Sequence, residues 1–285
     1  MEQRYSLTYT KDKELSFTLP EDVVVQQMKS RSGVIAKSPE AICRAVSSAL
    51  NAPCGKSLEE VLEEKGAPLL LIVDDHTRST PVKEVLDVLV PRLEQCGLKD
   101  SDISIITANG THREMIPEEV DGKLGEYGKR FKVYQHNCYA SESLESYGDL
   151  DGIPVLLNKH LKEARTILAV GSTVPHRFCG WSGGGKIITP GLSGYETIFQ
   201  THCRALLREQ IAPGMYPNWF RTFIDEVGRR AGLSFVVNFV SGAEGYYGVV
   251  AGTPDSTLME GIRIGMEYSC QEFDERFDVA IISSY

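Results

Sequence analysis

A glycine-rich stretch with one lysine, "CGWSGGGKIITPG" over residues 179–191, has a spacing that could bind a phosphate. Gly180, Gly185 and Lys186 follow the pattern G-x-x-x-x-G-K of phosphate-binding loops in nucleoside triphosphatases. Such a loop needs Ser or Thr after the lysine, because that hydroxyl binds Mg²⁺, whereas this chain has Ile187. Pro190 also disfavours the helix that would have to follow. The loop therefore predicts a lysine held close to a ligand, but not a triphosphatase.

A second polar cluster, "DDHTRSTP", begins at Asp74 and Asp75. Paired aspartates can bind a divalent metal through their oxygens, although an isolated pair more often caps a helix or forms a surface ion pair. Arg78 shifts the balance toward a ligand site, because a guanidinium at the end of a buried strand suits a carboxylate or a phosphate.

The sequence contains six histidines, and any single one is more often structural than catalytic. His112 in "NGTHR" and His176 in "TVPHR" stand out because each follows a strand-end loop and precedes an arginine. His202 lies in "FQTHCR" on a predicted helix, whereas His136 and His160 are interpreted as structural. The spacings H-x-x-x-H and H-E-x-x-H are absent. This weakens the case for a zinc hydrolase and leaves room for a metal held mostly by a cofactor.

Alternating strands and helices must position these residues. We predict a hairpin within residues 4–19, buried strands at 68–75, 102–110, 130–137 and 164–173, a strand at 233–240, and a last strand at 276–285. Helices are predicted at 38–50, 56–66, 194–207, 218–232 and 254–271, with another that Pro81 opens and Pro91 kinks or ends. The fold class is α/β, with a largely parallel or mixed sheet and helices on both faces. Ligands bind beyond the carboxyl ends of such strands, where the polar clusters lie.

Composition limits the possible functions. The chain has 285 residues with a net charge of −9, which disfavours nucleic-acid binding. The absence of an 18-residue apolar run or an apolar N-terminal core predicts no membrane span and no signal peptide. Seven scattered cysteines without a C-x-x-C pair are typical of reduced thiols, so we expect a cytoplasmic protein.

Four motifs, "DDHTRSTP", "GTHR", "VPHRFCGWSGGGKIITPG" and "THC", together resemble in order and spacing the lactate racemase family that uses a nickel-pincer nucleotide. The resemblance extends from about Asp74 to the C-terminus, with Trp181 where a phenylalanine is expected. It implies a racemase or epimerase of a lactate-like 2-hydroxy acid, working by reversible hydride transfer to a covalently bound cofactor. That cofactor is pyridinium-3,5-bisthiocarboxylic acid mononucleotide with nickel, so cofactor-maturation enzymes are expected partners.

The resemblance also assigns roles to individual residues. Lys186 matches the lysine that forms a thioamide bond to the cofactor, and His202 matches the nickel ligand. His112 and His176 match the two acid/base histidines, one for each enantiomer. Asp75 is expected near the cofactor, and Arg78 on the substrate carboxylate. The loop residues expected to bind the cofactor are Ser182, Gly183, Gly184 and Gly185.

Members of this family continue into a second, smaller lobe that closes over the substrate, and most of this lobe is expected to be absent here. The expected domains are a cofactor-binding catalytic domain over residues 1–272 and the start of a truncated second domain over residues 273–285. A lid excludes water and orients the substrate, so the isolated chain is expected to be poorly active.

Two other classes remain open from the sequence. One is a metal-dependent lyase or hydrolase acting on a small phosphorylated or carboxylate substrate. The other is a non-catalytic paralogue, although all six matched positions outside the glycines are intact. Nickel together with a covalent adduct would distinguish the racemase interpretation from the first of these.

Overall fold

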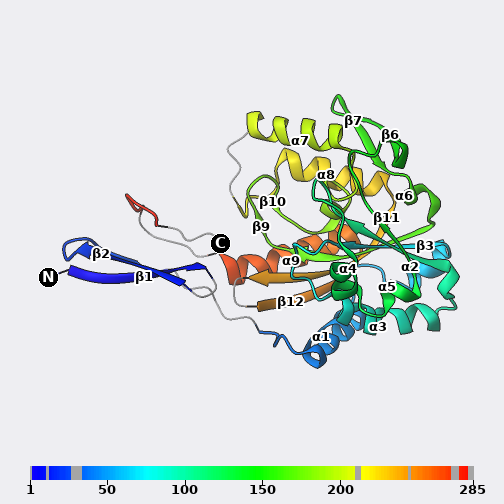
Figure 1. Ribbon diagram of the computed structural model, residues 1–285, viewed down its shortest axis with the longest axis horizontal. Helices are drawn as coiled ribbons and strands as arrows, with labels where there is room; N and C mark the ends of the chain where they lie inside the picture. The colour runs from blue at the N-terminus through cyan, green and yellow to red at the C-terminus, as the bar shows by residue number, and fades with distance from the viewer. Residues whose placement is uncertain are drawn as a thin grey trace. The chain divides into compact units, whose positions relative to one another are not determined.

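A six-stranded sheet forms the centre of the computed structural model (Figure 1), which describes residues 2–10, 13–26, 34–208, 213–242, 245–270 and 276–281. The strand order is β12-β11-β8-β3-β4-β5, in which β12 is antiparallel to β11 and all other neighbours are parallel. This confirms the predicted α/β class. The strands are β3 (Leu69–Asp74), β4 (Ile103–Ala108), β5 (Lys132–Gln135), β8 (Thr166–Thr173), β11 (Leu233–Gly242) and β12 (Gly245–Gly252).

Strand β3 illustrates why the central strands are continuous apolar runs. All six of its residues are buried, and successive side chains point to opposite faces of the sheet. Leu69, Leu71 and Val73 join one core with α1, α2 and α3, whereas Leu70 and Ile72 join a second core on the other face. Because helices cover both faces, apolar side chains are favoured on both.

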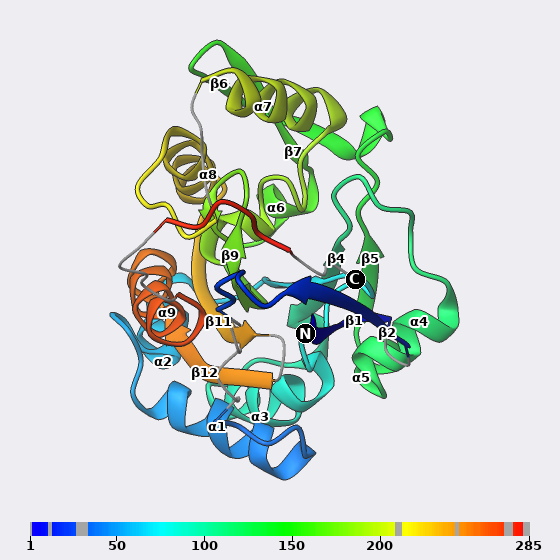
Figure 2. The same ribbon diagram turned by 90° about the vertical axis from the view of Figure 1, so that its left-hand side faces the viewer.

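Helices lie on both sides of the sheet, as predicted. Figures 1 and 2 show α1 and α3 on one side and α7 and α8 on the other. The helices are α1 (Pro39–Asn51), α2 (Leu58–Lys65), α3 (Val82–Gln95), α4 (Pro117–Leu124), α5 (Tyr127–Arg130), α6 (His160–Glu163), α7 (Tyr195–Arg208), α8 (Trp219–Arg230) and α9 (Pro254–Ser269).

The predicted helix starts are confirmed by their capping contacts. The Ser38 hydroxyl accepts the N–H of Ala41, and Ser57 and Glu60 form the reciprocal contacts of a capping box. Helix α3 does not end at Pro91 but continues to Gln95. The buried side chains on either side of this proline, among them Leu93, pack into the core and outweigh its helix-breaking tendency.

Several elements were not predicted. They are the hairpin of β6 (Leu144–Leu150) and β7 (Ile153–Asn158), strand β12, and the short helices α4, α5 and α6. The predicted C-terminal strand is wrong over residues 276–281, which form neither helix nor strand. These residues are exposed, whereas a stable strand needs a pairing partner and a packed face. Residues 282–285 lie outside the described part of the chain.

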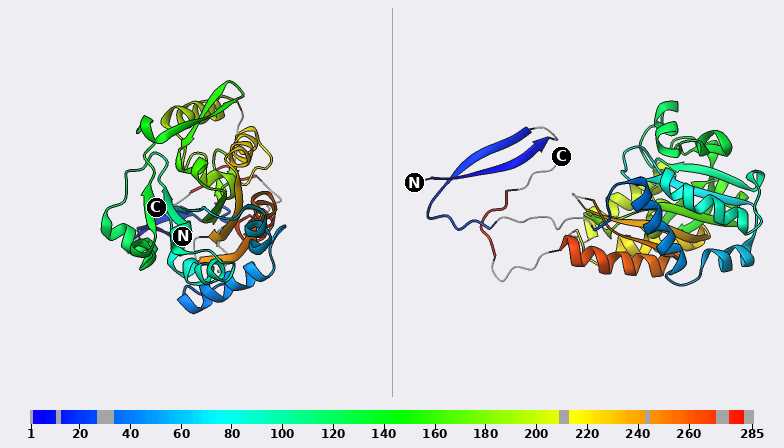
Figure 3. Two further views of the ribbon diagram at one scale, coloured as in Figure 1. Left: turned by 90° about the vertical axis from the view of Figure 1, so that its right-hand side faces the viewer. Right: turned by 90° about the horizontal axis from the view of Figure 1, so that it is seen from below.

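The chain divides into two compact units, Arg31–Cys270 and a smaller unit made of Met1–Ser30 with Gln271–Tyr285. The smaller unit contains the predicted N-terminal hairpin, in which β1 (Glu2–Thr10) pairs antiparallel with β2 (Lys13–Pro20) (Figure 3). In the described residues, none of the helices has the length and apolar character needed to cross a bilayer.

Candidate active site

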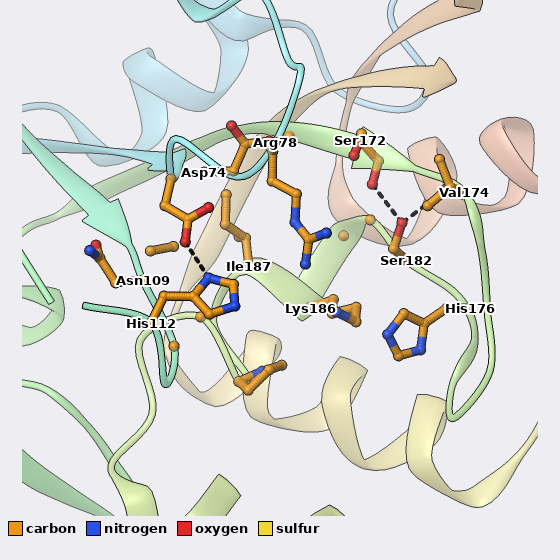
Figure 4. Close-up of a pocket in the computed structure, with 18 of the residues that line it drawn as sticks. Asp74, Arg78, Asn109, His112, Ser172, Val174, His176, Ser182, Lys186 and Ile187 are labelled. Carbon is orange, nitrogen blue, oxygen red and sulfur yellow. Dashed lines mark hydrogen bonds and ion pairs between the residues drawn. The ribbon is translucent and has the colours of Figure 1, made fainter. Parts of the chain in front are cut away.

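A pocket of about 340 Å³ lies in the larger unit, beyond the carboxyl ends of β3, β4 and β8. Figure 4 shows Arg78, His112, His176 and Lys186 around this pocket, each from a different segment of the chain. His176 belongs to β9 (Pro175–His176), which pairs with β10 (Gly180–Trp181). The glycine loop, residues 182–186, follows β10 directly. The rule that ligands bind beyond the carboxyl ends of parallel strands therefore predicted the position of the pocket correctly.

Nearly all residues singled out in the sequence line this pocket. Those that do so are Asp75, Arg78, His112, His176, Ser182, Gly183, Gly184, Lys186 and His202. Gly185 is not among the lining residues. A Cβ atom at Gly185 would lie 2.7 Å from the backbone oxygen of Ile224, so this glycine lies against helix α8.

His112 and Asp75 form a hydrogen-bonded pair at the pocket. Nδ1 of His112 lies 2.5 Å from Oδ2 of Asp75, whose side chain is buried while that of His112 is partly exposed. Burial opposes ionisation of Asp75, but contacts from Thr77 and His112 keep the pKa of this carboxyl below its usual value. An ionised Asp75 can accept the Nδ1 proton, which leaves Nε2 of His112 free to act as a base.

Lys123 of helix α4 supports the loop that carries Asp75 and Arg78. Its buried Nζ lies 2.6 Å from Oδ1 of Asp74 and donates to the carbonyl of Arg78 at 2.9 Å. Burial raises the pKa of Asp74, and the lysine ammonium partly offsets this effect. Asp74 is therefore a structural partner of Lys123, in a buried ion pair and not in the helix cap or surface ion pair that the structural interpretation expected.

Arg78 faces the pocket without a carboxylate of its own. In the described part of the chain, no acidic side chain lies within ion-pair distance of its guanidinium, since Asp74 and Asp75 are engaged elsewhere. The pocket therefore contains a positive charge suited to a ligand carboxylate or phosphate.

His176 is held against the turn that follows it. Its Nδ1 faces the backbone N–H groups of Phe178 at 3.2 Å and Cys179 at 3.4 Å. Burial, together with the nearby charges of Lys186 and Arg78, lowers the pKa of His176 to about 3. This imidazole is accordingly neutral at ordinary pH.

Lys186 lies in a 3₁₀ turn, η3 (Gly184–Ile187), at the base of the pocket. No α-helix follows until α7, as the sequence predicts. Among the described residues, its ammonium has neither an ion-pair nor a hydrogen-bond partner, and burial lowers its pKa with help from Arg78 and Arg221. A lysine with a lowered pKa is more often neutral, and the neutral amine is the nucleophilic form.

Arg221 of helix α8 binds backbone carbonyls at the start of the glycine loop. Its side chain is 1% exposed, pairs with Asp225, and donates to the carbonyls of Trp181 at 3.2 Å and Gly183 at 3.1 Å. The loop that carries Lys186 is therefore fixed by a buried charge and by the backbone contact at Gly185.

Gly185→Ala is expected to destabilise the protein by about 1–3 kcal/mol, because the new Cβ would overlap the oxygen of Ile224. Gly122→Ala in α4 is the matched control, since a Cβ there meets nothing within 4 Å and alanine favours a helix by roughly 0.5–1 kcal/mol. Urea denaturation measures both free energies of unfolding. Equal midpoints for the two variants would contradict the close approach of loop and helix.

Two buried polar atoms near Gly183 have no partner in the described structure. They are Oγ1 of Thr173 and Nδ2 of Asn238, and the latter residue lines the pocket. A Cβ at Gly183 would lie 2.4 Å from the first atom and 3.0 Å from the second, at a φ of +92°. By contrast, the Ser182 hydroxyl is already used, because it donates to Ser172 and accepts from Val174 (Figure 4).

His202 of helix α7 uses one ring nitrogen, Nδ1, for a contact with the backbone. Its Nδ1 lies 2.8 Å from the carbonyl of Ile198, which requires a proton on Nδ1 and leaves Nε2 as a lone pair. Burial, together with nearby Lys186, lowers the pKa of His202, which favours the neutral form that binds metals. No three His, Cys, Asp or Glu side chains of the described residues come together as a metal site.

His136 and His160 lie outside the pocket, as expected of structural residues. Nε2 of His136 donates to the carbonyl of Ser193 at 3.0 Å, and its Nδ1 accepts from Asn158 at 3.2 Å. His160 stacks on Tyr134 and pairs with Glu163. Burial lowers the pKa of His136 to about 4 from 6.5.

The free energy of unfolding should therefore fall as the pH is lowered from about 6.5 to about 4. In this window the unfolded chain binds a proton at His136 and the folded protein does not, which costs up to about 3 kcal/mol at the lower limit. His136→Gln should show a flatter dependence in urea titrations at a series of pH values. If the free energies of unfolding of wild type and His136→Gln changed in parallel with pH, His136 would not contribute to the pH dependence of stability.

The sequence did not reveal several residues that shape the site. Lys123, Arg221 and Asn238 lie on elements remote in sequence from the motifs at the pocket, so no local motif marks them. Arg177 and Phe178 also line the pocket, and their position directly after His176 was an available signal.

Comparison with known proteins shows which family this chain resembles. Residues 9–213 match the family model described as the lactate racemase N-terminal domain. The chain is 31% identical over 243 residues to the lactate racemase of Thermoanaerobacterium thermosaccharolyticum, covering 82% of this chain and 55% of that protein. It is 29% identical over 199 residues to the lactate racemase of Lactiplantibacillus plantarum, covering 68% and 47%. The chain thus spans about half the length of these relatives.

Solved structures agree with this similarity. The lactate racemase apoprotein from Thermoanaerobacterium thermosaccharolyticum superposes with a TM-score of 0.82 at 26% identity, over 93% of this chain and 63% of that one. A Thermotoga maritima protein superposes with a TM-score of 0.62 at 25% identity, over 81% and 59%.

Proposed function

This chain belongs to the lactate racemase family, and on that basis we propose that it racemises or epimerises a small 2-hydroxy acid. The observation that carries the proposal is the pocket itself. Six side chains at the motif positions of the family line this one cavity: Asp75, Arg78, His112, His176, Lys186 and His202.

The residues of the pocket are suited to a nickel-pincer nucleotide. Within the described residues, Lys186 has no partner and His202 keeps Nε2 free, and Nδ2 of Asn238 is buried without an acceptor. Burial also lowers the pKa of Lys186. We propose that Lys186 forms the thioamide bond and that His202 ligates the nickel. Gly183, Gly184 and Asn238 would face the polar groups of the nucleotide. When bound, this cofactor supplies an acceptor for the hydride of C2, which it returns to either face.

The side chains of the protein would handle the substrate. Arg78 is assigned to the substrate carboxylate, because no carboxylate of the described residues lies within ion-pair distance of its guanidinium. His112 is assigned to the hydroxyl proton, because Asp75 orients the ring with Nε2 free. His176 would contact the hydroxyl oxygen from the other side of the pocket. The maturation enzymes that build the cofactor are the proposed partners.

The proposal can be tested with the 285-residue chain produced together with cofactor-maturation enzymes and nickel. Chiral chromatography should then show that each of several 2-hydroxy acids, supplied as one enantiomer, converts slowly toward the racemate. Chain produced without the maturation enzymes is the control and should show no conversion. A nickel-loaded chain that converts none of these acids at any rate would contradict the assignment.

A further inference from the structure

The two pocket histidines differ in what their Nδ1 atoms contact. Nδ1 of His112 lies 2.5 Å from the carboxylate of Asp75. Nδ1 of His176 instead receives the backbone N–H groups of Phe178 at 3.2 Å and Cys179 at 3.4 Å. An ionised carboxylate can only accept a hydrogen bond, whereas a backbone N–H can only donate one. The two rings therefore need their protons on different nitrogens.

We propose that the two histidines are held in opposite neutral tautomers. A neutral imidazole carries one proton, so a proton on Nδ1 of His112 leaves Nε2 as an acceptor toward the pocket. In His176 the Nδ1 lone pair is occupied by two donors, so the proton sits on Nε2. Of these two histidines, His112 is thus the proton acceptor and His176 the hydrogen-bond donor. Asp75 and the turn after His176 act as positioning groups.

The thiol of Cys179 is compatible with this assignment. Its sulfur lies 3.3 Å from Nδ1 of His176 and 3.1 Å from the carbonyl of Trp181. Burial raises the pKa of the thiol, so it keeps its proton and can donate to either acceptor. The two backbone donors remain when the sulfur is removed, so the tautomer of His176 should not depend on it.

The consequence for chemistry rests on the proposed function. As the substrate is oxidised, its hydroxyl O–H bond breaks and the proton moves to Nε2 of His112. The C2–H bond would break at the same time, and the cofactor, held by Lys186 and His202, would supply the acceptor for its hydride, so that the substrate becomes a ketone. His176 cannot take that proton at Nε2 in its resting tautomer, but it can donate to the ketone oxygen. The two histidines are therefore not interchangeable.

The tautomers can be read directly from the 285-residue chain labelled with ¹⁵N at histidine. Long-range ¹H–¹⁵N correlation distinguishes protonated from bare ring nitrogens, and His112→Gln and His176→Gln identify the two sets of signals. At neutral pH we expect a bare Nε2 in His112 and a bare Nδ1 in His176. The same tautomer in both rings, or a ring protonated on both nitrogens, would overturn the proposal. Neither cofactor nor substrate is needed, so this result is independent of racemase activity.

Two variants separate the positioning groups. Asp75→Leu should release His112 from its fixed tautomer and leave the signals of His176 unchanged. Cys179→Ala should leave both tautomers unchanged, because the backbone donors remain. A reversed tautomer of His176 in Cys179→Ala would show that the sulfur, and not the backbone, sets it, and would overturn this assignment. The wild-type spectrum decides the main question if Asp75→Leu does not fold.

Discussion

His112→Gln is expected to lower the turnover of the cofactor-loaded chain by about 10²–10⁴-fold, the range typical for loss of a general base. Glutamine has an amide nitrogen where the base is needed, and an amide does not accept a proton at neutral pH. Nickel content should be unchanged, because His202 and not His112 is the proposed ligand. Turnover comes from chiral chromatography and nickel from elemental analysis of the same sample.

His176→Gln provides the matched comparison. Glutamine keeps an N–H donor, so the loss should be small, within about tenfold for one neutral hydrogen bond. Equal losses in the two variants would contradict the division of roles between the two histidines. Wild-type turnover in His112→Gln would contradict the assignment of the base.

Lys186→Ala and Lys186→Arg are both expected to abolish turnover and to release nickel from the purified protein. Alanine has no amine, and the guanidinium of arginine is never deprotonated, so neither can form the bond to the cofactor. The arginine variant is the more informative one, since its guanidinium can replace any positive charge that Lys186 contributes. A structural role for that charge would be preserved in Lys186→Arg and lost in Lys186→Ala.

Elemental analysis after gel filtration should therefore find nickel in the matured wild-type protein and not in either variant. Circular dichroism is the control for folding, because the lysine lies in the buried glycine loop. If Lys186→Arg retained nickel and turnover, covalent attachment at this residue would be excluded.

The central strands could be predicted because burial on both faces makes them distinctive. The run "LLLIVD" is apolar at every position but the last, which is uncommon outside a covered parallel strand. Strand β12 and the β6–β7 hairpin lack this signal. Strand β12 contains three glycines within Gly245–Gly252, and β6 is polar with mostly exposed side chains. Their pairing is set by tertiary contacts that no local pattern encodes.

The pocket was predictable to a similar degree. The rule that ligands bind beyond parallel strand ends identified the loops of Arg78, His112 and His176, and the glycine pattern identified Lys186. The charged side chains that bind the backbone of the pocket loops were not predictable. Lys123 reaches the carbonyl of Arg78 across 45 positions, and Arg221 reaches that of Trp181 across 40. Such contacts depend on the packing of α4 and α8, which only the folded chain brings to the loops.

The mass of the peptide that contains Lys186 tests the central claim most directly. The chain is matured with nickel and the cofactor-maturation enzymes, digested, and compared with chain made without them. Covalent attachment predicts an added mass, located on Lys186 by fragmentation, in the matured sample alone. An unmodified Lys186 peptide from chain that contains nickel and racemises a 2-hydroxy acid would contradict the claim.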